Sequence, residues 1–228
     1  MVDSLSVAPD RVRVIRNWTH LPAAPTGGQR EMRDRFQWQP DEVVVLHAGN
    51  MGMKQGLENV VNAARIAEER NSPLRFVLMG DGNQRRRLEE LAAGLTKIDF
   101  VDPLPDEDFQ VALSAADFLL VNELPDVKDM AVPSKLTSYF NAGVPVVAAT
   151  DRESVTAAEI SASGGGVRVD AANPLLLVET IENLSRDPDM TRRLAANGLR
   201  FRSVTLSEDT AIAHYDEFLS TIVSARSQ

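Results

Sequence analysis

The sequence predicts an α/β fold, a Rossmann-like doubly wound parallel sheet of about six strands. Short apolar runs alternate with amphipathic helical stretches from about residue 43 onward, which is the pattern that βαβ units leave in a sequence. Glycines gather where several of these runs end, as expected where a strand turns tightly into a helix. Together the two observations favour parallel strands with helices on both faces.

The predicted strands are the short apolar runs, each ended by glycine, proline or polar residues. They are residues 43–48, 74–79, 98–101, 117–121, 146–149 and 167–169. A further short strand is expected at 12–15. Apolar residues at helical spacing predict helices at 57–70, 84–93, 106–115, 133–142, 174–185, 190–197 and 207–223, with Gly198 ending the sixth.

The domain organisation follows from this pattern. Residues 1–40 contain the linker-like stretch 22–28 and are interpreted as a linker or strap that enters the domain. Residues 41–228 then form one domain that ends in helices alone. No internal repeat and no second region large enough for its own cleft is visible.

Composition excludes several classes of function. The 24 Lys and Arg against 33 Asp and Glu give a net charge of −9, which argues against nucleic acid as a partner. The absence of cysteine excludes disulfides, thiolate metal sites and a cysteine nucleophile. The three histidines, His20, His47 and His214, have no metal-binding spacing, so no metal site is predicted. No signal peptide or membrane span is visible.

The first candidate site is the glycine-rich loop after the first predicted strand. Gly49, Asn50 and Gly52 stand where a backbone without Cβ atoms can approach a phosphate, and Lys54 follows. The alternative is a tight strand-to-helix turn without a ligand. The glycines around Gly80, after the second strand, indicate a tight turn in the first place. A contact with a ligand is the second interpretation.

The second candidate site is the run VPSKLTSYFNAGVPVVA, residues 132–148. Ser134 suits an N-cap or first-turn position, and Lys135 brings a cation to the positive end of the helix. An anion such as a diphosphate fits there, between this helix start and the loop at Gly49. The alternative is a capped helix with an exposed lysine.

Catalytic residues cannot be assigned from the pattern. His47 lies inside the first predicted strand and is interpreted as a buried histidine with its hydrogen bonds satisfied. The acidic residues expected near the cleft are Asp81, Asp102, Glu123 and Asp126. They form no recognisable acid and base pair.

The motifs GNMG, KQGLE, FVLMGDGNQRRRLEELA and VPSKLTSYFNAGVPVVA, in this order and spacing, resemble the carboxyl-terminal half of retaining glycosyltransferases of family 4. The opening VAPDRVRVIRNW is similar to the segment that joins the two domains of their GT-B fold. The versions of the motifs most resemble the bacterial subgroup that builds exopolysaccharide, capsule and O-antigen.

The resemblance implies a nucleotide-diphosphate sugar as donor, UDP- or GDP-linked, and no metal cofactor. It places the diphosphate at the first loop and the helix start, and the base at the segment after the third strand. The implied donor-binding residues are Gly49, Asn50, Gly52, Lys54, Gly80, Phe100, Val101, Pro103, Ser134, Lys135, Leu136 and Ser138. Asn50 stands where many members have arginine, and Met130 and Ser138 stand where many have glutamates.

The resemblance also implies partners. The amino-terminal acceptor domain is missing, so the chain is expected to be an excised domain that binds donor without transferring sugar. The expected location is cytoplasmic, peripheral to the inner membrane through the missing half, with a lipid-linked acceptor. Two rival interpretations are a domain like nucleotide-sugar 2-epimerases, which would want acid and base groups in the cleft, and a non-catalytic module that binds nucleotide sugars.

Overall fold

The computed structural model describes residues 12–16, 18, 27–127 and 134–226. Six strands form one sheet, in the order β3-β2-β1-β4-β5-β6, and every pair of neighbours is parallel. The strands are β1 (Val43–Ala48), β2 (Leu74–Met79), β3 (Ile98–Val101), β4 (Phe118–Asn122), β5 (Val146–Ala149) and β6 (Gly166–Val169). The predicted α/β class and the six strands of the sheet are confirmed.

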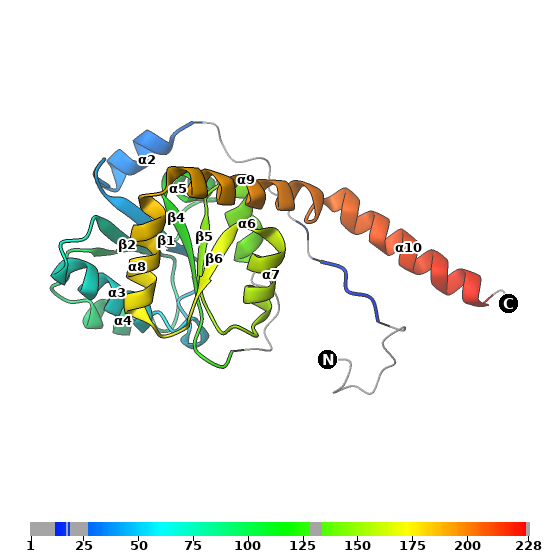
Figure 1. Ribbon diagram of the computed structural model, residues 1–228, viewed down its shortest axis with the longest axis horizontal. Helices are drawn as coiled ribbons and strands as arrows, with labels where there is room; N and C mark the ends of the chain where they lie inside the picture. Colours follow the sequence, from blue (N-terminus) through cyan, green and yellow to red (C-terminus); the bar gives the residue numbers. More distant parts are fainter. Residues whose placement is uncertain (1–11, 17, 19–26, 128–133, 227–228) are drawn as a thin grey trace.

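Helices cover both faces of the sheet (Figure 1). One face carries α2 (Gln29–Arg35), α5 (Asp106–Ala115), α6 (Lys135–Ala142) and α7 (Val155–Ser163). The other carries α3 (Glu58–Glu69), α4 (Arg85–Leu91) and α8 (Pro174–Ser185). A short 3₁₀ helix, η2 (Met53–Gln55), precedes α3, and α9 (Pro188–Val204) packs against α6, α7 and α8. The last helix is α10 (Glu208–Arg226).

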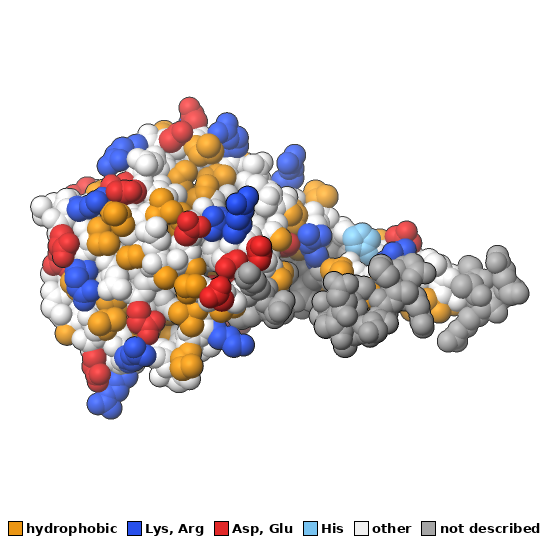
Figure 2. All heavy atoms as spheres, turned by 60° about the horizontal axis from the view of Figure 1, so that its bottom comes forward, with side chains coloured by type: hydrophobic (Ala, Val, Ile, Leu, Met, Phe, Trp, Pro, Cys, Tyr) orange, Lys and Arg blue, Asp and Glu red, His pale blue; other side chains and the backbone are white. Residues whose placement is uncertain are grey.

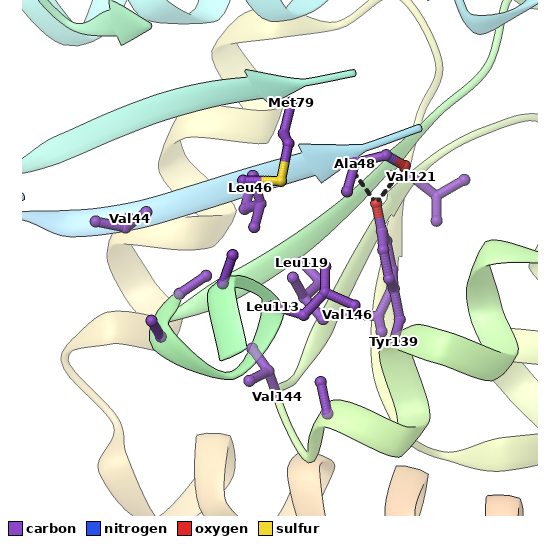
Figure 3. Close-up of a cluster of buried hydrophobic side chains, with 14 of the residues drawn as sticks. Val44, Leu46, Ala48, Met79, Leu113, Leu119, Val121, Tyr139, Val144 and Val146 are labelled. Carbon is purple, nitrogen blue, oxygen red and sulfur yellow. Dashed lines mark hydrogen bonds between the residues drawn. The ribbon is translucent and has the colours of Figure 1, made fainter. Parts of the chain in front are cut away.

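The core has two halves because side chains alternate along each strand. Leu46 of β1 belongs to the cluster under α5 and α6, whereas its neighbour Val45 belongs to the cluster under α3 and α8. Figure 3 shows the first cluster, in which Leu119 and Val146 of the next strands lie near Tyr139 of α6. Strands buried on both faces read as continuous apolar runs, which explains why the sequence located them well.

Three local predictions are wrong or incomplete. Residues 12–15 form no strand; Val14 is 85% exposed there, so this stretch has no apolar face to bury on a sheet. Helices α2 and α7 were not predicted. Both lack a strong apolar stripe, although Ser154 caps α7 by accepting from the Ala157 N–H at 3.0 Å.

Gly198 does not end a helix, because α9 continues through it to Val204. Its role is close packing instead. A Cβ at Gly165 would lie 2.7 Å from the Gly198 Cα, and a Cβ at Gly198 would lie 3.0 Å from the Phe140 ring. The glycine therefore allows α9 to approach the start of β6, a requirement that periodicity in the sequence does not reveal.

Helix α10 extends away from the sheet as an arm (Figure 1). Several of its larger apolar side chains are exposed, from 38% at Ile222 to 66% at Val223, while Phe218 is half-buried. No helix in the described part of the chain is both long and apolar enough to cross a membrane. On the face drawn in Figure 2, acidic and basic side chains are interspersed rather than gathered by sign.

Candidate functional site

The order of the strands reverses between β1 and β4, and this reversal marks the crevice where open α/β sheets bind ligands. The two strands also separate there. β1 pairs with β2 along its whole length, but with β4 only at Val45–Phe118 and Leu46–Leu119. Their carboxyl ends therefore leave backbone groups that need other partners.

Side chains supply those partners. The Tyr139 hydroxyl accepts from the Ala48 N–H at 2.8 Å and lies 3.3 Å from the Leu120 carbonyl oxygen. His47 Nδ1 lies 3.2 Å from the same carbonyl. Both side chains are fully buried. A tyrosine from α6 and a histidine from β1 thus meet at one backbone carbonyl where β1 and β4 separate.

Asn122, the last residue of β4, fixes the chain that follows the first glycine loop. Its amide nitrogen donates to the Gln55 and Gly56 carbonyls at 2.7 and 2.9 Å. Its oxygen accepts from the amide of Asn59 in α3 at 2.8 Å. Because Asn122 holds η2 and the start of α3 together, the end of the glycine loop that leads into α3 is fixed.

Backbone hydrogen bonds join the first two glycine turns at this edge of the sheet to the ends of the neighbouring strands. Gly49 N–H donates to the Met79 carbonyl at 2.8 Å, and Gly80 N–H donates to the Val101 carbonyl at 2.9 Å. Gly80 has φ +134°, and a Cβ there would lie 2.0 Å from the Gly49 oxygen. Because the backbone at Gly49 lies so close, position 80 requires glycine even if no ligand binds there.

Lys135 lies where the crevice and the first loop meet. Its Nζ is 3.4 Å from His47 Nε2, and a Cβ at Gly49 would lie 3.7 Å from that Nζ. Burial lowers the pKa of Lys135 to about 8, while the charge of Glu123 acts in the opposite direction. The ammonium is therefore held in a poorly solvated position, where an anion would stabilise it.

Glu123, just after β4, is a buried carboxylate on the other side of the crevice. It accepts hydrogen bonds from the hydroxyls of Thr150, after β5, and of Thr156, in α7, the latter at 2.7 Å. These bonds fix its position, so its negative charge stands at a constant place relative to Lys135. The sequence placed Glu123 near the cleft, but only the fold shows its partners.

His47 is neutral in this setting. Burial, and next the Lys135 ammonium, hold its pKa well below the usual value, whereas the carbonyls of Leu120 and Asn50 act the other way. The expectation of a buried histidine with a hydrogen-bond partner is confirmed. Its second ring nitrogen faces the cation, which the sequence did not predict.

The other residues predicted at the helix start are placed differently from Lys135. Ser134 is at the N-cap position, one of the two positions expected of it, but it has helical conformation and its side chain makes no capping bond. Leu136 is fully buried in the core, so only its backbone can face a ligand. Ser138 is half-buried one turn further on. Pro133 and Met130 lie outside the described residues.

The remaining predicted residues follow the same edge. Lys54 is exposed in η2, and Asn50 lies against Gly52, where an added Cβ would meet its amide nitrogen at 2.8 Å. Phe100 and Val101 of β3 are half-buried and Pro103 is exposed.

Arg85 was not predicted among the residues at this edge of the sheet. It donates to the Gly80 carbonyl at 2.8 Å and pairs with Asp102 at 2.7 Å. Its position just after the second glycine turn is the signal that was available.

The described residues contain no group of three His, Asp or Glu side chains that could hold a metal ion. A cavity of about 360 Å³ opens beyond β5 and β6 and is lined by Thr150, Asp151, Arg152 and Asp170 among others. It neighbours the Glu123 cluster through Thr150 and includes none of the predicted donor-binding residues.

Fold and site together define a doubly wound α/β domain whose switch point carries a half-buried cation beside a glycine loop. The chain belongs to the family described as glycosyl transferases group 1, whose model matches residues 28–201. The family expected from the motifs is thereby confirmed at this level.

Two curated relatives are similar to this chain in sequence. The putative colanic acid biosynthesis glycosyl transferase WcaI of Escherichia coli K12 is 33% identical over 144 residues, 60% of this chain and 34% of the relative. The probable glycosyltransferase WbjE of Pseudomonas aeruginosa is 27% identical over 141 residues, again 60% and 34%. The chain thus spans about a third of the length of the curated relatives it matches.

Solved structures share the fold. HepE of Anabaena, in complex with UDP and glucose, matches with a TM-score of 0.78 at 18% identity, over 96% of this chain and 59% of that one. The carboxyl-terminal domain of the group 1 protein LpcC of Francisella tularensis matches with 0.66 at 15%, over 82% and 96%. The six-strand sheet is accordingly the Rossmann-like half of a GT-B fold.

Proposed function

We propose that this chain is the donor-binding part of a retaining glycosyltransferase that takes a UDP- or GDP-linked sugar in the assembly of a bacterial surface polysaccharide. Membership of the glycosyl transferases group 1 supports the reaction class. The name of WcaI refers to colanic acid, and HepE was solved with UDP-glucose, which supports the pathway and the donor class.

The observation that carries the proposal is the placement of Lys135. Its ammonium lies at the switch point, next to Gly49 and at the start of α6. A diphosphate there meets the ammonium, the positive end of the helix and the backbone of a loop that has glycine at positions 49 and 52. Ser134 leaves this helix start without a side-chain cap, so a ligand oxygen can take the place of one.

In the proposed reaction these groups act on the leaving diphosphate. As the bond from the sugar to the diphosphate breaks, negative charge grows on the phosphate oxygen, and Lys135 and the α6 dipole stabilise it. This neutralisation needs no divalent metal. The opposite wall of the cleft and the acceptor site come from an amino-terminal half, which also carries the enzyme to a lipid-linked acceptor at the cytoplasmic side of the inner membrane.

Calorimetry tests the proposal directly. UDP, GDP, ADP and dTDP, and then their sugars, are titrated into the chain with EDTA present. One base is expected to bind, equally well with and without magnesium, and a ligand specific for the folded state should also raise the melting temperature. No binding by any of the four nucleotides would contradict the proposal, and a strict need for magnesium would contradict its metal-free form.

A transfer assay separates enzyme from binding module. The chain alone is expected to bind donor and form no product. Mixing it with an amino-terminal half from a relative such as WcaI should restore transfer to an acceptor. Tight donor binding that never leads to transfer in such mixtures would favour the non-catalytic module.

A further inference from the structure

The imidazole of His47 links the two strands of the switch point to the cation. Its Nδ1 lies 3.2 Å from the Leu120 carbonyl oxygen, and its Nε2 lies 3.4 Å from Lys135 Nζ. A carbonyl oxygen can only accept, so we assign the proton of the neutral ring to Nδ1, which faces Leu120 at hydrogen-bond distance; the Asn50 carbonyl also acts to raise the pKa of the ring. Nε2 then presents a lone pair, and the ammonium is the donor that faces it.

The surroundings hold this ring in place. His47 is fully buried in β1, and the Tyr139 hydroxyl shares the Leu120 carbonyl with it. Burial in the sheet leaves the imidazole no room to turn away. A lysine side chain has four rotatable bonds, and a fixed acceptor at its tip removes much of that freedom before any ligand arrives.

A neutral acceptor has an advantage over a carboxylate at this point. A carboxylate in contact with Lys135 would cancel its charge and compete with a diphosphate for the ammonium protons. The lone pair of a neutral imidazole uses one of the three donors and leaves the charge intact. Glu123 supplies negative charge to the same lysine while its own oxygens are taken by Thr150 and Thr156.

We infer that His47 is a positioning residue, whose Nε2 holds the Lys135 ammonium beside the Gly49 loop so that it meets the diphosphate of the donor. The ligand in this inference, the diphosphate, rests on the proposed function. The contact between His47 and Lys135 does not. In this inference β1 contributes to donor binding by positioning Lys135 through His47. Neither the glycine loop nor the start of α6 supplies that contact.

The geometry is tested without any ligand. In the ¹⁵N-histidine NMR spectrum at pH 7, the His47 resonances are identified by their loss in His47→Gln. The expected tautomer has the proton on Nδ1, and Lys135→Met should change the Nε2 shift, because it removes the donor. A proton on Nε2, or an Nε2 shift that does not respond to Lys135→Met, would overturn the inference.

The role in binding is tested by a double-mutant cycle with UDP or whichever nucleoside diphosphate binds. His47→Phe should weaken binding about 3- to 10-fold in the wild-type background and leave it unchanged in the Lys135→Met background. A merely structural histidine would instead cost the same affinity in both backgrounds, which would overturn the inference.

A conservative variant keeps the test decisive if His47→Phe does not fold. The amide oxygen of His47→Gln can take the place of Nε2 as acceptor, so this variant should recover most of the affinity that other substitutions lose. If the wild type binds no nucleoside diphosphate, the proposed function fails together with the role given to His47. If it binds well but His47→Gln binds as poorly as Lys135→Met, only the role of His47 fails.

Discussion

The hydroxyl of Tyr139 accepts a hydrogen bond from the backbone N–H of Ala48 at 2.8 Å (Figure 3). A side chain of α6 thus takes the place of the strand partner that the end of β1 lacks. The same bond sets the distance between β1 and the helix, because both atoms are buried and neither can turn to water. The position of Lys135, one turn earlier in α6, depends on it.

Removing that hydroxyl should destabilise the fold. Tyr139→Phe leaves the buried Ala48 N–H without its acceptor, so we expect a loss of about 1–3 kcal/mol in the free energy of unfolding. Urea denaturation measures it. Tyr215→Phe is the matched control, since Tyr215 is 46% exposed on α10 and its change should have almost no effect. Equal stability of the two variants would mean that the Tyr139 bond contributes little.

Removing the Lys135 ammonium should weaken binding of the nucleoside diphosphate. Lys135→Ala loses a charge-assisted contact, for which we expect roughly 1.5–3 kcal/mol, or about 10- to 100-fold in Kd. Calorimetry at pH 7 measures it, and the melting temperature should not fall. The control is Lys97→Ala, whose ammonium lies 3.7 Å from Glu42 at the opposite edge of the sheet. Unchanged affinity in Lys135→Ala would remove this lysine from the site.

The affinity should also depend on pH through Lys135. Its pKa of about 8 means that the ammonium is present at pH 7 and is lost as the pH rises through 8. Binding of a diphosphate should therefore weaken progressively above pH 8. Burial raises the pKa of Tyr139 and lowers that of His47, so neither changes charge in this range. In Lys135→Met the decline should be absent.

Stability without ligand should change in the opposite direction. Between pH 8 and the model-peptide value of 10.5, the unfolded chain holds the Lys135 proton and the folded chain does not. The free energy of unfolding therefore gains a term that rises with pH across this window. The difference between wild type and Lys135→Met, measured by urea denaturation from pH 7 to 10, isolates that term. A difference that is constant with pH would contradict it.

Neutralising Glu123 should move the alkaline decline in affinity. Its charge raises the pKa of Lys135, so Glu123→Gln is expected to lower that pKa and shift the decline in donor binding below pH 8. The glutamine oxygen can accept from one of the two threonine hydroxyls and its NH2 can donate to the other, which keeps the variant folded. Glu153→Gln, an exposed acidic residue nearby, serves as control. An unmoved pH profile would show that Glu123 has no influence on the lysine.

A methyl group at Gly80 should damage the loops. Gly80→Ala combines φ +134° with a Cβ 2.0 Å from the Gly49 oxygen, so we expect a loss of more than about 2 kcal/mol in stability. Gly94→Ala is the matched control, with φ +84° and nothing within 4 Å of the new Cβ. It should cost about 1 kcal/mol from the backbone alone. Similar losses in both would show that the loops can move apart.

The elements that the sequence predicted well are those with a periodic apolar signal. β1, β2, β3 and β5 begin and end as predicted, because each is a mainly apolar run bounded by glycine, proline or polar residues, and only His47, Arg75 and Asp99 interrupt these runs. Helix α7 was missed because both of its sides are partly buried, which erases the stripe. Gly198 was misinterpreted because the sequence cannot show which distant backbone, here Gly165, approaches a glycine.

The site was predictable in its loops and less so in its side chains. Lys135 and the loop at Gly49 follow from spacing and from the fold class. The roles of Tyr139 and Glu123 do not, because they arise where β1 and β4 separate, and that separation joins residues far apart in the chain. Leu136, predicted at the site, is a core residue because its side chain packs in the buried cluster that contains Tyr139 and Phe140.

The backbone bonds of the loops after β1 and β2 have a consequence for how this edge of the sheet can evolve. Met51 bonds to the Asp81 carbonyl in the second loop, and Gly80 bonds to the Val101 carbonyl at the end of β3, so lengthening the first or the second loop would break these bonds. Variation should therefore be tolerated as single side-chain exchanges on an unchanged backbone and rejected as insertions. New ligand preferences in such a domain would arise by altering side chains over an unchanged backbone, and the lengths of the first two loops should be inherited together.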